Sequence, residues 1–207
     1  METRTVRAAL WLLPLHAVLL VLGTLTHQPD PKAAFDAYAR YVTTGPFLAS
    51  HLGASILGAA LGVLGVVAAA AYLRPAPATY LAVAGTVIGN VVTSAVFGAA
   101  AFAQPAVGRA QLRGSPDAAA IDADVYGLPL VATALVGVLL LIVGAVGLGT
   151  AVARRGLRAA GVAYAVLLPV FVVAGFTVQA AQPVAAAGLA VAAGVIAARL
   201  PADPPSS

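Results

Sequence analysis

The segment from Val125 to Ala153, VYGLPLVATALVGVLLLIVGAVGLGTAVA, decides the class of fold, because it contains no charged side chain. A helix rises about 1.5 Å per residue, and about 20 apolar residues cross the roughly 30 Å hydrocarbon core of a bilayer. This segment is long enough to do so. Arg154 and Arg155 follow it directly, as is typical at the end of a span that reaches the membrane surface.

The rest of the chain repeats this pattern. Its 207 residues are 61% hydrophobic and 9% charged, whereas a soluble domain carries about 25% charged residues. We predict an all-α transmembrane bundle that forms one domain over residues 1–200, followed by a disordered tail at 201–207. The predicted spans are residues 5–26, 46–73, 79–103, 125–153, 157–178 and 183–200. This composition excludes a soluble enzyme and a nucleic-acid-binding domain, and the absence of cysteine excludes disulfides and thiolate ligands.

The basic residues predict the orientation, because short cytoplasmic loops carry an excess of lysine and arginine. With both termini inside, seven of the eleven basic residues are cytoplasmic: Arg4, Arg7, Arg74, Arg154, Arg155, Arg158 and Arg199. Four are then outside: Lys32, Arg40, Arg109 and Arg113. We therefore expect an N-in, C-in protein whose two longest connections lie outside.

Both of these outer connections carry helix signals. In the first, Asp30 is a candidate cap for a helix that begins at Pro31. Its spacing predicts an amphipathic helix lying on the outer membrane surface, with apolar residues on one face: Phe35, Tyr38, Ala39 and Val42. The second connection, Gln104–Asp124, has a turn at Gly114 followed by a helix start at Asp117.

Few polar side chains lie within the predicted spans, and many of them share a helix face with small residues, as His51, Ser55 and Gly58 do. Small residues let membrane helices approach closely, and polar groups in hydrocarbon need partners, so these faces are expected to point into the bundle. Most of the polar groups fall near the outer end, which predicts a site that opens outward. The candidate ligand-binding residues are His16, His27, His51, Asn90, Gln104, Tyr126, Gln179 and Gln182.

A divalent metal is one possible ligand of this outer end. Imidazole and carboxylate groups together suit zinc, copper, iron or nickel, and the candidate ligands are His27, His51, Asp30, Asp122 and Asp124. These residues have no local spacing that is typical of a metal site. The alternative is that His27 is a solvated loop residue and that His51 is packed and hydrogen-bonded.

Two polar residues, His16 and Asn90, are predicted near the middle of the membrane. A histidine there is costly unless it is paired, and such residues often mark a proton or substrate path. Asn90 lies at a similar depth and is a candidate partner, so a structural hydrogen bond between two helices is the alternative. Haem is not expected, because no second inward histidine lies at the depth of His16.

The leading functional hypothesis is a binding or transport-like module with an outward-facing cavity for a small apolar ligand, a lipid or a metal. One alternative is a membrane enzyme that acts on a lipophilic substrate, with a histidine as acid or base and Tyr126 or Asp122 assisting. Another is an accessory subunit of a membrane complex. The expected partners are membrane lipid, a small lipophilic ligand, and a second copy or a partner protein.

The first third of the chain also carries a recurring pattern. A first span ends in a histidine, an amphipathic helix follows, and an aromatic residue precedes a histidine by four positions: His27-Gln28-Pro29, Phe35, Tyr38, Phe47 and His51-Leu52-Gly53. Over about the first 75 residues the chain resembles small multi-pass membrane proteins of high-GC Gram-positive (actinobacterial) bacteria. The resemblance implies a bacterial plasma-membrane location and an outer site around His27 and His51. It implies no activity.

The predicted orientation can be tested with cysteine labelling, because the chain has no native cysteine. Single cysteines at Asp36 and Ser115 should react with a membrane-impermeant maleimide added to intact cells. A cysteine at Arg155 should react only after the membrane is opened. Labelling of the opposite set would reverse the topology.

Overall fold

The computed structural model describes residues 3–25 and 27–202, and these residues form helices and turns without a strand. Six helices are long and apolar enough to cross a membrane, as predicted: Arg4–Gly23, Gly45–Ala70, Pro77–Leu112, Leu128–Arg154, Arg158–Thr177 and Gln179–Arg199. The first span contains α1 (Thr3–Ala9) and α2 (Leu12–Gly23). The second contains α4 (Gly45–Ala49), the π-helix η1 (Ser50–Leu57) and α5 (Gly58–Ala70). Of the predicted tail, residues 203–207 lie outside the described residues.

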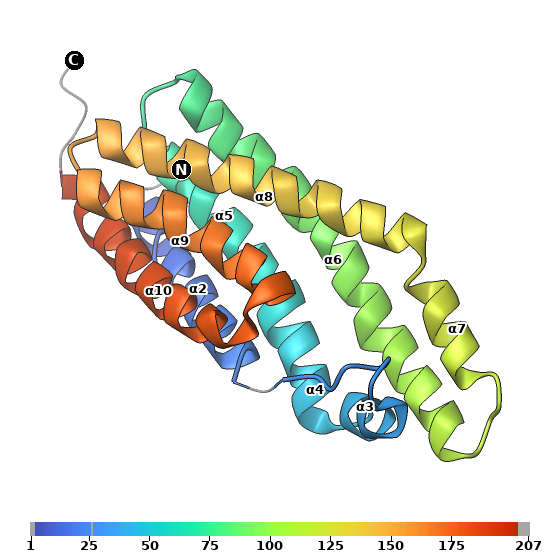
Figure 1. The fold of residues 1–207 in the computed structure, drawn as a ribbon. Helices are drawn as coiled ribbons and strands as arrows, with labels where there is room; N and C mark the ends of the chain where they lie inside the picture. The colour runs from blue at the N-terminus through green and yellow to red at the C-terminus, as the bar shows by residue number, and fades with distance from the viewer. Residues whose placement is uncertain (1–2, 26, 203–207) are drawn as a thin grey trace.

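The six spans are arranged as a ring in chain order (Figure 1). Helix α2 contacts α5, which contacts α6 (Pro77–Leu112), and α6 contacts α8 (Leu128–Arg154). The ring continues through α9 (Arg158–Thr177) to α10 (Gln182–Arg199), which packs back against α2. Each span therefore has two spans as neighbours, and the faces that point inward surround a common centre.

Two short helices cover one end of this ring, which we call the α7 end. They are α3 (Phe35–Val42), packed against α6, and α7 (Ala118–Val125), which follows the turn at Gly114. At this end α2 and α9 finish, and η1, α8 and α10 begin (Figure 1). The apolar face of α3 is buried by protein, since Tyr38, Ala39 and Val42 are almost fully inaccessible to solvent.

Helices α6 and α8 pack with their backbones in direct contact along glycines. A Cβ atom added to Gly144 would lie 2.6 Å from the amide nitrogen of Thr86, and one added to Gly85 would lie 2.6 Å from the amide nitrogen of Gly144. Lipid provides no hydrophobic driving force between helices, so such close packing is what holds membrane helices together. These glycines therefore form a seam between two helices of the same chain, the α6–α8 seam.

The predicted end of the third span near Ala103 is wrong. Helix α6 continues through Pro105 to Leu112. Proline in a helix removes one backbone hydrogen bond, and that cost is usually enough to end or kink a helix. Here the segment beyond Pro105 is supported by α3: a Cβ atom on Gly108 would lie 2.7 Å from Val42 Cγ2 and 2.8 Å from the Ala39 carbonyl oxygen. Packing between helices overrides the local signal, and Gln104 becomes a buried helical residue.

The predicted helix start at Pro31 is also wrong. Residues 31–33 form a turn, and the Asp30 carboxylate accepts a hydrogen bond of 2.9 Å from the Lys32 amide. An aspartate can cap such a turn as readily as it caps a helix. Helix α3 begins at Phe35 instead, and Asp36 on its polar face accepts a hydrogen bond from Gln111 of α6 at 2.8 Å.

The second span is irregular at the α7 end. In η1 the backbone hydrogen bonds join residues that are five positions apart, as in the bond from the Gly58 amide to the Gly53 carbonyl oxygen. A π-helical segment of this kind is rare and is often found at functional sites. It places His51 and Ser55 on the wall of the space at the centre of the ring, in a segment that lacks the regular spacing of an α-helix.

The seam between α6 and α8 is tested by a pair of glycine variants. Gly144→Ala should lower the free energy of unfolding by about 1–3 kcal/mol, because the new methyl group meets backbone atoms that cannot move aside. Gly194→Ala in α10 is the matched control, since its Cβ meets no atom within 4 Å; there the better helix propensity of alanine should stabilise by up to about 1 kcal/mol. Thermal unfolding in detergent measures both, and equal effects would contradict the packing described.

Candidate functional site

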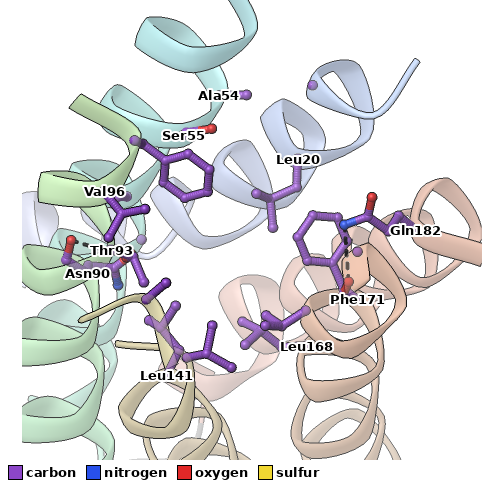
Figure 2. A pocket seen from close by; sticks show the side chains of 18 of the residues that line it. Leu20, Ala54, Ser55, Asn90, Thr93, Val96, Leu141, Leu168, Phe171 and Gln182 are labelled. Carbon is purple, nitrogen blue, oxygen red and sulfur yellow. Dashed lines mark hydrogen bonds between the residues drawn. The ribbon is translucent and has the colours of Figure 1, made fainter. Parts of the chain in front are cut away.

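The ring of helices encloses a cavity of about 620 Å³, a size typical of small-molecule sites. Residues of α2, η1, α5, α6, α8, α9 and α10 line it, and most of its wall is apolar. Figure 2 shows Asn90 and Thr93 of α6 on one side, and Phe171 and Gln182 across from them. None of the lining residues is a lysine, arginine, aspartate or glutamate.

The polar groups of the wall are concentrated toward the α7 end and in the middle of the cavity. Those at the α7 end come from helix ends that meet there: Thr24, Ser50, His51, Tyr126 and Gln182. Those in the middle are His16, Thr86, Asn90 and Thr93. Farther from the α7 end the wall is formed by Leu141, Ala145 and Leu168, with Tyr164 as its polar group. The cavity is thus amphipathic along its length.

His51 is held in one orientation by η1 and α4. Its Nδ1 lies 3.0 Å from the Phe47 carbonyl oxygen and 3.2 Å from Ser50 Oγ, and its ring stacks on Phe47 with centroids 4.1 Å apart. A carbonyl oxygen only accepts, so the hydrogen-bond network assigns the proton to Nδ1. Within the described part of the chain, Nε2 is then an acceptor without a hydrogen-bond partner.

Asn90 is almost fully buried, with 8% of its surface exposed. Its Nδ2 donates to the Thr86 carbonyl oxygen, one turn back in the same helix, at 2.8 Å. That bond fixes the amide nitrogen on the helix side and leaves Oδ1 without a hydrogen-bond partner among the described residues. The amide is therefore a second acceptor on the cavity wall.

The predicted pairing of His16 with Asn90 is wrong. The His16 ring lies against the glycines of α5: a Cβ atom added to Gly62 would lie 3.1 Å from its Cδ2, and one added to Gly58 would lie 3.4 Å from its Nδ1. His16 Nδ1 is buried and has no hydrogen-bond partner in the described part of the chain. An asparagine can bond the carbonyl four residues back without any second helix, and here that local bond is the one that forms.

Gln182 joins the first turn of α10 to α9. Its Nε2 donates to the Phe171 carbonyl oxygen at 3.2 Å (Figure 2), which leaves Oε1 without a hydrogen-bond partner among the described residues. A Cβ atom added to Gly175 would lie 2.7 Å from the same Nε2, so a side chain at that position would displace the Gln182 amide. Helix α10 begins at Gln182, one residue before the predicted start, and Pro183 lies in its first turn, where proline is favoured.

A second group of polar residues lies behind the cavity at the α7 end. Asp122 of α7 is buried, and its carboxylate accepts a hydrogen bond from the Tyr38 hydroxyl of α3 at 2.7 Å. Burial raises the pKa of Tyr38, and the hydrogen bond to Asp122 raises it further. Burial and the Asp122 carboxylate also raise the pKa of Tyr126, whereas Gln104 lowers it. This contact therefore ties α3 to α7.

The predicted metal site does not form. Within the described residues, no three histidine or carboxylate side chains come together in a way that could hold an ion. His27, Asp30 and Asp124 are exposed, Asp122 is bonded to Tyr38, and none of these four lines the cavity. His27 lies exposed in the loop between α2 and α3, so it does not share a site with His51.

The structure brings five of the eight predicted ligand-binding residues to one cavity: His16, His51, Asn90, Tyr126 and Gln182. His27 and Gln179 are exposed, and Gln104 is buried in α6 beside Tyr126; these three do not line it. Tyr164 was missed as a site residue. Its place on one face of α9 with Leu168 and Phe171 was the signal that could have identified it.

The cavity also reaches the outer surface of the ring between α8 and α9. Three of its lining residues are largely exposed: Val131 (47%), Leu135 (53%) and Phe176 (69%). All three lie in the halves of these spans nearest the α7 end, where α8 and α9 diverge (Figure 1). The same helices are in contact near their connection, where Gly149 meets Gly161. The wall is therefore closed at one end and open at the other.

Comparisons of the chain with family models, curated proteins and solved structures find no match. The resemblance of the first 75 residues to actinobacterial membrane proteins thus stays a prediction.

The contact between α3 and α7 is tested by removing one hydroxyl. Tyr38→Phe should lower the free energy of unfolding by about 1–3 kcal/mol, because the buried Asp122 carboxyl group loses its donor. Tyr80→Phe is the matched control, since Tyr80 is 66% exposed. Thermal unfolding in detergent compares the two, and a Tyr38→Phe protein as stable as the control would mean that the bond contributes nothing.

Proposed function

We propose that this protein is a membrane-embedded binding module that holds a lipophilic small molecule or lipid in the cavity of its helical ring. The observation that carries the proposal is the cavity itself, which is about 620 Å³ in size and mostly apolar, with a few polar atoms that have no hydrogen-bond partner among the described residues. Small-molecule sites have this composition, because apolar walls provide affinity and a few polar groups set orientation.

The opening between α8 and α9 supports a ligand that arrives through the membrane. Val131, Leu135 and Phe176 belong to two spans, so the surface that they expose faces hydrocarbon when the helices cross a bilayer. A lipophilic molecule dissolved in the bilayer reaches such an opening without passing through water. The bacterial plasma membrane and the N-in, C-in orientation are part of this proposal, and they place the opening in the outer leaflet.

We favour binding over the alternative of a histidine-based enzyme. His51 contacts a backbone carbonyl and a serine, and the candidate acid Asp122 is bonded to Tyr38 and does not line the cavity, although Tyr126 does. A histidine that acts as acid or base is usually paired with a group that tunes its basicity. A site for an unreacted ligand requires no such pairing.

A cavity-filling variant tests the proposal. Ala134→Phe places a ring in the cavity, and Ala132→Phe, two residues away on α8 at an exposed position that does not line it, is the matched control. Mass spectrometry of organic extracts should find a lipophilic compound that co-purifies with the native protein and with Ala132→Phe. Its amount should fall at least about fivefold in Ala134→Phe, a change of about 1 kcal/mol in binding free energy. Equal amounts in all three proteins would overturn the proposal.

A further inference from the structure

The cavity wall restricts the charge of its ligand. Among the described residues, the ionisable side chains that line it are two histidines and two tyrosines: His16, His51, Tyr126 and Tyr164. An ionised group moved into such a wall loses its hydration and gains no opposite charge, which is strongly unfavourable. A phosphate or carboxylate would need an arginine or lysine, and an ammonium would need a carboxylate. The wall offers neither, so it is suited to an uncharged molecule.

Three of the unpartnered atoms on the wall are acceptors. His51 Nε2 is left with a lone pair because Nδ1 holds the proton against the Phe47 carbonyl. Asn90 Oδ1 and Gln182 Oε1 are left free because the nitrogen of each amide donates to a backbone carbonyl. Within the described part of the chain, three acceptors therefore lack a donor. The Tyr126 hydroxyl and His16 Nδ1, on the same wall, also lack a partner there. A ligand hydroxyl group, which both donates and accepts, suits such a wall.

The acceptors also define which end of the ligand binds where. His51 and Gln182 lie at the α7 end, beside the opening between α8 and α9, and Asn90 lies farther in. Beyond them the wall is formed by Leu141, Leu168 and Val172. A molecule with a hydrogen-bond donor at one end and a hydrocarbon chain at the other matches this order.

We infer that the ligand is a neutral hydroxyl-bearing lipid, such as a long-chain alcohol, a prenol or an acylglycerol. Its hydroxyl group donates to the acceptors of Asn90, His51 or Gln182, and its chain occupies the apolar part of the cavity. This inference rests on the proposed function and goes further by fixing the chemical class of the ligand. Charged phospholipids, fatty acids and alkylamines are excluded from the cavity.

A series of C12 probes that differ only in head group tests this inference. The full chain, purified in a non-ionic detergent, is mixed with dodecane, 1-dodecanol, dodecanoate, dodecyl phosphate or dodecylammonium, and its thermal midpoint is measured. A ligand that binds only the folded state raises the midpoint as its concentration rises. We expect 1-dodecanol to give the largest shift, dodecane a smaller one, and the three charged probes none.

Two variants of α6 locate the hydrogen bond. Asn90→Leu removes an acceptor that faces the cavity, and the affinity for 1-dodecanol should fall about tenfold while that for dodecane is unchanged. Thr93→Val is the matched control: Thr93 lines the same cavity, but its hydroxyl already donates to the Gly89 carbonyl at 2.9 Å. It should keep the preference for the alcohol. If Asn90→Leu does not fold, Gln182→Met removes an acceptor at the α7 end and serves in its place.

The outcomes separate this inference from the proposed function. If no probe, dodecane included, changes the midpoint, the cavity does not bind lipophiles and the proposed function is overturned. If dodecane and 1-dodecanol act equally, the function stands and the hydrogen-bond assignment is overturned. If a charged probe acts as strongly as the alcohol, the function stands and the neutral class is wrong.

Discussion

A polar atom inside a bilayer has no water to bond, and this single constraint accounts for most of what the six helices do with their side chains. Threonine and asparagine residues in the spans satisfy their donors on backbone carbonyls of the same helix, as Thr93 does with Gly89 and Asn90 does with Thr86. Those bonds consume donors and leave acceptors behind. Three acceptors without a donor among the described residues line the cavity: His51 Nε2, Asn90 Oδ1 and Gln182 Oε1.

The same constraint explains how the bundle is held together. Hydrocarbon solvates leucine and valine as well as a neighbouring helix does, so the spans gain from contact only where their backbones come close. Glycines provide this at the α6–α8 seam and at the crossing of α8 and α9, where Gly149 meets Gly161. Where no such seam continues, as in the halves of α8 and α9 nearest the α7 end, the helices separate and the cavity opens. The positions of the glycines therefore determine both where the helices pack together and where the cavity opens.

The sequence was sufficient for the number of spans and for five of the cavity residues, because hydropathy and the shared faces of polar and small residues are properties of single helices. It was insufficient where the structure of one segment depends on its contacts with another segment. Helix α6 continues through Pro105 because α3 packs against it. The Asp122 carboxylate is hydrogen-bonded to the hydroxyl of Tyr38, a residue 84 positions away in the sequence, and is therefore not available to a metal. His27 lies off the cavity that His51 lines, because the path of a loop cannot be read from composition.

The π-helical segment from Ser50 to Leu57 has a consequence for how such a chain can vary. A π segment holds more residues in the same length than an α-helix does, so it behaves as an insertion absorbed inside a span. Loss of one residue there would restore α geometry and leave the two flanking helices, α4 and α5, in the same relative orientation. The change would be confined to the segment itself, which carries His51 and Ser55. In this span, the count of residues matters as much as their kind.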